Sequence, residues 1–204
     1  MTRTGARTAL IACGAVAQDT AALVHTHGWD ADVHGISSDL HMTPLDIAPA
    51  VEEKLRRLVP DYDRVIVVYG DCGTGGRLDE VLARYPAVRP AGVHCFEWYS
   101  GELYQRFHEE PGIYFLTDWL VQNWDRAVIK GLGLDRFPWL KETYFDNITR
   151  ILFVRQHPDP DREAKAREIA AWMDRPIEIH DLGIRPLEEL LAPLMEEDVD
   201  AVRP

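Results

Sequence analysis

The feature that most constrains the fold is a continuous apolar run, VIVVY at residues 65–69, which lies between Asp63 and Gly70. A strand that is exposed on one face alternates apolar and polar residues, whereas a strand buried on both faces is apolar throughout. Such strands occur mainly in parallel sheets covered by helices on both sides. The run therefore predicts a central strand of a parallel sheet.

Further short apolar runs alternate with amphipathic, helical patterns along the chain. Strands that alternate with helices indicate a mainly parallel sheet with helical crossovers. We therefore predict an α/β fold with a doubly wound, mainly parallel sheet of the Rossmann-like type. The predicted strands are 8–13, 31–37, 63–70, 90–95, 150–156 and 176–182, and the predicted helices are 17–28, 44–59, 78–85, 101–110, 160–173 and 186–196.

The length of 204 residues is compatible with one domain, and 46% hydrophobic residues suffice for a core without disulfides. Residues 112–148 differ from the rest because they are rich in aromatic side chains, including Trp119, Trp124 and Trp139. We expect a single α/β domain over 1–204, with a helical insert at about 112–148 lying over one face.

The charge and hydropathy of the chain restrict its partners. A formal net charge of -12 opposes broad docking on nucleic acid or on anionic lipid, so we expect small molecules or other proteins instead. No apolar run approaches the roughly 20 residues of a membrane span. Leu10–Cys13 is similar to a lipoprotein cleavage site, but the apolar stretch before it is too short for a secretory signal. We expect a cytoplasmic protein with reduced thiols.

The three cysteines all follow predicted strands: Cys13 ends the first, Cys72 lies just past the third and Cys95 ends the fourth. Ligands of open α/β sheets bind beyond the carboxyl ends of the strands, so the three thiols are expected to converge on one crevice. Three thiolates suit an iron–sulfur cluster or zinc. The alternative is that these cysteines are ordinary small core residues.

Glycines surround two of these cysteines, in Cys13-Gly14 and in GDCGTGG at residues 70–76. Glycine allows a ligand to approach the backbone closely, so Gly14, Gly73, Thr74 and Gly75 are predicted to contact a cofactor. A Walker loop is excluded because no Lys and Ser/Thr follow the last glycine, and the spacing fits neither a nucleophile elbow nor a dinucleotide fingerprint. An anion resting on the amides of residues 74–76 stays open.

Side chains around Cys95 supply further candidates. Glu97 is a candidate proton donor in the same crevice, with Trp98 and Tyr99 excluding water. In a strand, His94 would point away from Cys95, so we expect His94 in the core or behind the ligands. Four other histidines lie near helix ends, on a polar helix or in a loop, and are expected to be solvated: His25, His27, His108 and His157.

Taken in order, ACG at 12–14, YGDCGTGG at 69–76, HC at 94–95 and the EPG to LTD stretch at 110–118 resemble the domain-of-unknown-function family numbered 1638. The resemblance covers residue 8 to about 155. It implies an accessory role in corrinoid-dependent methyl transfer from methylamines or betaine, with corrinoid methyltransferase components as partners. Other members carry an Asp between the His and Cys of the 94–95 motif.

We therefore expect a metalloprotein in which Cys13, Cys72 and Cys95 hold a 4Fe–4S cluster with one iron open to a substrate. Two alternatives stay open. One is a non-catalytic protein that binds or delivers a corrinoid or a metal, and the other is a zinc thiolate site. The sequence does not choose a reaction, or decide between redox chemistry and Lewis-acid activation.

Overall fold

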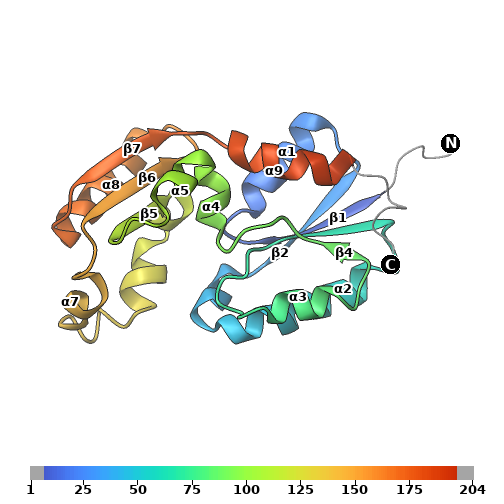
Figure 1. The fold of residues 1–204 in the computed structure, drawn as a ribbon, viewed down its shortest axis with the longest axis horizontal. Coiled ribbons are helices and arrows are strands. Elements are labelled where there is room, and N and C mark those ends of the chain that lie inside the picture. The colour runs from blue at the N-terminus through green and yellow to red at the C-terminus, as the bar shows by residue number, and fades with distance from the viewer. Residues whose placement is uncertain (1–6, 197–204) are drawn as a thin grey trace. The chain divides into compact units, whose positions relative to one another are not determined.

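The computed structural model describes residues 7–196, which form two compact units. Of the described residues, the first unit contains 7–95 and 187–196, and the second is Phe96–Pro186. Each unit has its own parallel sheet flanked by helices (Figure 1). The predicted α/β class with parallel strands is confirmed, but the strands are divided between two sheets.

The sheet of the first unit has the order β2-β1-β3-β4, with all neighbours parallel. The apolar run of residues 65–69 supplies β3, whose five residues are all buried. It lies beside β1, which is also buried throughout, so the two form the centre of the sheet. The strands are β1 (Thr8–Cys13), β2 (Ala31–Ile36), β3 (Arg64–Val68) and β4 (Ala87–Val88).

Helices cover both faces of this sheet, with α1 and α9 on one face and α2 and α3 on the other (Figure 1). Helix α1 ends at Gly28, whose left-handed conformation (φ 63°) terminates it. Arg64 on β3 anchors α9 by donating to the carbonyls of Leu194 and Met195, each at 2.8 Å. The helices are α1 (Ala17–His27), α2 (Ile47–Leu58), α3 (Arg77–Leu82) and α9 (Arg185–Glu196), with two short 3-10 helices at Ser38–Met42 and Pro44–Asp46.

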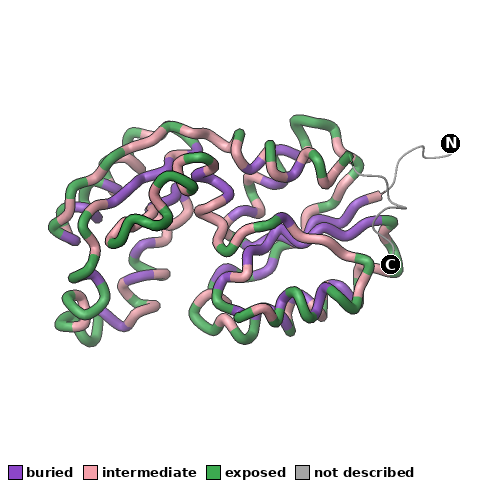
Figure 2. The backbone as a smooth tube through the Cα atoms, in the orientation of Figure 1, coloured by how far each residue is buried: buried purple, intermediate pink, exposed green. Residues whose placement is uncertain are grey.

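The second unit contains a sheet of order β5-β6-β7, again parallel. Its core includes Leu116, Trp124, Phe145 and Phe153, and the Trp124 and Phe145 rings lie 6.4 Å apart. The strands are β5 (Ile113–Thr117), β6 (Arg150–Arg155) and β7 (Ile177–Asp181); the helices are α4 (Cys95–Ser100), α5 (Glu102–Phe107), α6 (Asp118–Gln122), a π-helix at Asp125–Lys130, α7 (Leu140–Phe145) and α8 (Pro160–Met173). Figure 2 shows burial concentrated on the strands of both units.

Two sequence expectations are wrong. The strand expected at 90–95 is absent, because β4 ends at Val88 and Cys95 begins α4. Arg89 instead donates to the carbonyls of Pro90 and Gly92 at 3.2 and 3.1 Å, which holds this segment as a loop. The insert at 112–148 is not wholly helical, because Ile113–Thr117 form β5.

No helix within residues 7–196 is long and apolar enough to cross a bilayer.

Candidate functional site

The first sheet has a topological switch point between β1 and β3. From β1 the chain crosses to β2 on one side, and from β2 it returns past β1 to β3 on the other. Connections that leave neighbouring strands in opposite directions open a crevice at their carboxyl ends. Cys13 is the last residue of β1 and Cys72 lies four residues past the end of β3, so both belong to this crevice.

The loop that carries Cys72 is held in an uncommon conformation. Cys72 has a φ of 48°, in the left-handed region that a side chain rarely adopts. Asp71 holds the following turn, because its carboxylate accepts a hydrogen bond from the Thr74 hydroxyl and from the amides of Gly75 (3.2 Å) and Gly76 (2.9 Å). The Thr74 hydroxyl, and then the loop amides, lower the pKa of Asp71. An ionised Asp71 therefore fixes the backbone on which Cys72 is presented.

The third cysteine is brought in by the loop after β4. The amide of Cys72 donates to the carbonyl of Val93 at 2.9 Å, which joins the two loops. Gly70 makes this approach possible, because a Cβ at that position would lie 2.5 Å from the Val93 oxygen. The Cys95 amide also favours the thiolate form of Cys72, so Cys95 begins α4 directly beside that sulfur.

Tyr69 lies among the three thiols. Its side chain is fully buried, and its ring stacks on His41 with the centroids 5.7 Å apart. The Cys13 thiol lies beside the Tyr69 hydroxyl, yet within residues 7–196 this hydroxyl has no hydrogen bond of good geometry. A buried hydroxyl without a partner costs about 1–3 kcal/mol and calls for an explanation.

The pKa values of these groups follow from their burial. Burial, followed by the charges of Cys13, Cys72 and Cys95, raises the pKa of Tyr69 far above its usual value. Burial likewise raises the pKa of Cys13, and that of Cys72 to about 12. None of the three cysteines forms a disulfide. At neutral pH the thiols of Cys13 and Cys72 are therefore protonated unless a cation joins them.

The three predicted ligands thus gather around one buried ring at one end of one sheet. They do not form a finished coordination shell, because among the described residues no set of three or more His, Cys, Asp or Glu side chains is arranged so that it could hold a metal ion. The donor chemistry nevertheless fits a soft metal, and the Tyr69 hydroxyl, which has no well-aligned partner among the described residues, lies beside the Cys13 thiol.

The glycines predicted to contact a cofactor have backbone roles here. The amide of Gly14 donates to the carbonyl of Ile36 at 2.8 Å, and that of Thr74 to the carbonyl of Asp71 at 2.9 Å. Gly73 has a φ of 86° and packs beside Pro44. Because the Gly75 and Gly76 amides are bound to Asp71, an anion at this loop would have to displace that carboxylate.

Glu97 lies in the first turn of α4 and belongs to the second unit. Burial is the main cause that raises the pKa of Tyr104, and the charge of Glu97 is the second cause. Its role as a proton donor stays a prediction. His94 is half-buried in the loop before α4, whereas the four histidines expected to be solvated are exposed: His25, His27, His108 and His157.

Tyr69 and His41 are site residues that the sequence analysis did not predict. The signal for Tyr69 was present, because a tyrosine at the end of a fully buried strand needs a partner for its hydroxyl. The sequence around His41 has no comparable signal, because the 3-10 helix after β2 is what places its ring against Tyr69.

The second unit has a separate polar cluster at the carboxyl ends of β5 and β6. Asp118 is 6% exposed; its Oδ2 accepts from the His157 amide at 2.8 Å and from Arg162 at 2.7 Å, while its Oδ1 has no partner within the described part of the chain. Burial raises the pKa of Asp118.

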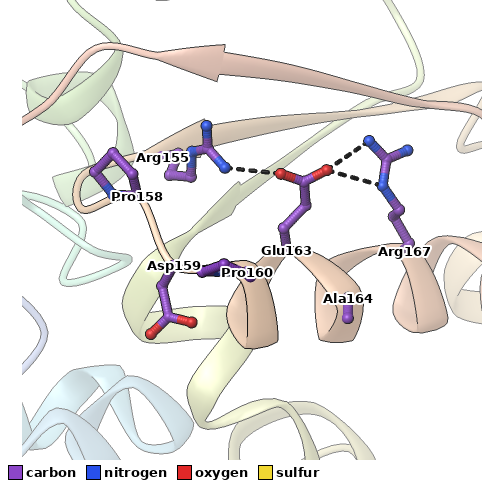
Figure 3. Close-up of a pocket in the computed structure, with 7 residues that line it drawn as sticks. All are labelled: Arg155, Pro158, Asp159, Pro160, Glu163, Ala164 and Arg167. Atoms are coloured by element: carbon purple, nitrogen blue, oxygen red, sulfur yellow. Dashed lines mark hydrogen bonds and ion pairs between the residues drawn. The ribbon is translucent and has the colours of Figure 1, made fainter.

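A cavity of about 400 Å³ lies at the start of α8 (Figure 3). Glu163 bridges two of its arginines, at 2.8 Å to Arg155 and 2.7 Å to Arg167. The positive and negative side chains of the cavity therefore balance, and their charges favour neither an anion nor a cation as ligand. The lining residues are Arg155, Pro158, Asp159, Pro160, Glu163, Ala164 and Arg167.

Comparison with known families gives a match to a family described as "Protein of unknown function (DUF1638)", over residues 36–191. The match contains Cys72 and Cys95, and it begins after Cys13, so it extends further toward the C-terminus and less toward the N-terminus than the motifs suggested. No curated protein matches the chain.

Proposed function

The chain belongs to the DUF1638 family, and from that premise we propose that it is a cytoplasmic metalloprotein whose Cys13, Cys72 and Cys95 hold a 4Fe–4S cluster. The observation that carries the proposal is the gathering of two buried thiols, Cys13 and Cys72, and the half-buried Cys95 near Tyr69 at the switch point of the first sheet. Thiolates are the ligands of iron–sulfur clusters.

The energetics of the centre support an incoming cation. The thiols of Cys13 and Cys72 are each disfavoured as anions by burial, and the Cys13 charge further raises the pKa of Cys72. A metal replaces the proton on each sulfur and removes this penalty, as it does whenever it binds thiols. Because the side chains do not yet converge on one point, we expect them to change rotamer as the metal enters.

Three protein ligands would leave one iron of a cluster open, which would supply either electron transfer or Lewis-acid activation of a small substrate. The residues around it would exclude water and hold the loop, with Tyr69 offering a hydrogen-bond donor. The resemblance to the family suggests an accessory role in corrinoid-dependent methylamine or betaine methyl transfer. The alternative is that the protein is not an enzyme but binds and delivers a corrinoid or a metal.

Anaerobic purification followed by iron, zinc and sulfide analysis tests the proposal. We expect iron and sulfide together, with absorbance near 400 nm, and their loss in each of Cys13→Ser, Cys72→Ser and Cys95→Ser. Ala12→Ser is the matched control, because it adds a hydroxyl to the same buried strand and leaves every thiol in place. Zinc without sulfide would select the zinc thiolate site, and a metal-free protein would refute both.

A further inference from the structure

A second cavity lies at the carboxyl end of β2, and none of the three cysteines lines it. It has a volume of about 250 Å³ and lies between the end of β2, the 3-10 helix after it and one side of α2. Drug-sized ligands occupy roughly 300–1,000 Å³, so this cavity suits a smaller molecule. Ile36, Leu40 and Ala50 supply its apolar wall.

The charged groups of the cavity are unequal. Arg57 and Glu53 form an ion pair one turn apart on α2, so their charges cancel. Lys54 also lines the cavity, is half-buried, and has no ion pair or hydrogen bond with any residue in 7–196. Its charge acts on His34, where it adds to burial in lowering the imidazole pKa. The cavity therefore carries one positive charge in excess within a chain of net charge -12.

We propose that this cavity binds a small carboxylate with a short apolar body, whose carboxylate pairs with Lys54. A single uncompensated ammonium matches a monoanion, and the wall of Ile36, Leu40 and Ala50 matches a few methylene groups. A cation would meet repulsion from Lys54, and a neutral molecule would leave the ammonium without a partner. The proposal does not require a metal at the thiols.

The cavity is connected to the residues of the switch point through its lining. Ile36 is the register partner of Cys13 on the neighbouring strand. Leu40 lines the cavity, and the next residue, His41, stacks on Tyr69. A carboxylate held here would lie one strand from the switch point, where open α/β sheets bind their ligands.

An NMR titration with butyrate tests the proposal, with butanol and butylamine as probes of matched shape and different charge. We expect butyrate to shift the amides of residues 35–40 and 50–57, and the other two probes to bind at least about tenfold more weakly, as the loss of a charge-assisted bond predicts. Lys54→Gln should weaken butyrate by a similar factor, whereas Lys54→Arg should keep it.

Arg56→Gln is the matched control, because it removes the same charge from the next-but-one position of α2 without touching the cavity. It should change butyrate binding less than about twofold. Equal binding of butyrate and butanol, retention of binding in a folded Lys54→Gln protein, or shifts spread outside the two segments would overturn the proposal. Each outcome is read in the metal-free protein and so is independent of the iron analysis.

Discussion

At the scale of single residues, a substitution of Tyr69 should affect the stability of the metal-free protein and the properties of the bound cluster differently. Its hydroxyl is buried and has no well-aligned partner in the described chain. In the metal-free protein, Tyr69→Phe should raise stability by about 1 kcal/mol, because it removes an unsatisfied buried group. In the iron-loaded protein, the same change should lower the reduction potential, since hydrogen bonds to cluster sulfurs set that potential.

Thermal unfolding and voltammetry measure the two effects. Tyr85→Phe is the control, because the Tyr85 hydroxyl does have a partner, Glu52 at 3.1 Å, and its loss should not stabilise the protein. A metal-free Tyr69→Phe protein that is clearly less stable than the wild type would mean that the hydroxyl has a structural bond after all.

Cys72 gives a prediction on pH. Its folded pKa is raised to about 12, mainly by burial, above an unfolded value of about 8.5. Between these values the unfolded chain loses a proton that the folded protein keeps. The contribution of this thiol is therefore complete below about pH 8.5 and is lost as the pH rises toward 12.

Urea unfolding of the metal-free protein between pH 7 and 10 checks this. The stability should fall with pH in the wild type and fall less steeply in Cys72→Ala. If the free energy of unfolding falls equally steeply with pH in the two proteins, burial does not keep the Cys72 thiol protonated in the folded protein.

At the scale of elements, the junction of the two loops rests on Gly70. A methyl group there would meet the backbone oxygen of Val93 at 2.5 Å, and backbone cannot swing aside as a side chain does. Gly70→Ala should therefore destabilise the first unit by about 1–3 kcal/mol and weaken metal binding, because it pushes Cys95 away from Cys72.

Gly35→Ala is the control, since a Cβ there meets nothing within 4 Å. Iron content and thermal unfolding are compared in both variants. Full iron content in Gly70→Ala would place Cys95 outside the ligand set.

Sequence reasoning worked best for elements whose own residues decide their structure. The apolar runs of β1, β3 and β6 and the periodic pattern of α2 are local signals, and all four elements are present. It failed at 90–95, where the Arg89 guanidinium and the Asp79 carboxylate, at 2.6 Å, hold a loop that apolar residues alone do not reveal. It also overlooked β5, whose run of Ile113–Thr117 is strand-like but precedes aromatic helices.

The candidate site was predictable to a similar degree. The positions of Cys13 and Cys72 follow from strand ends, which the sequence marks with apolar residues and glycine. Cys95 reaches the same place by a different route, through the hydrogen bond from the Cys72 amide to the Val93 carbonyl. Such a long-range backbone contact leaves no local pattern in the sequence.

At the scale of the whole molecule, the two units have separate sheets and separate cores. The core around Trp124 draws all its members from residues 114–179, and five of the six tryptophans lie in Phe96–Pro186. Val67→Asp should unfold the first unit, because a buried carboxylate without a partner costs several kcal/mol against a total of roughly 5–15.

Circular dichroism should register this loss, while tryptophan emission, which reports mainly on the second unit, should change little. Leu45→Asp, at a site 55% exposed in the first unit, should leave both signals intact. If Val67→Asp also shifts the emission to that of exposed tryptophan, the chain unfolds as the single domain that its length suggested.

The left-handed backbone of Cys72 has a consequence for how such sequences diverge. At a φ of 48°, glycine or asparagine would relieve strain of about 1 kcal/mol or more, so selection for stability alone favours replacing the cysteine. A lineage that lost the chemistry of the thiols should therefore drift first at this position, toward Gly or Asn. Position 72 would then serve as a marker that divides active descendants from inactive ones.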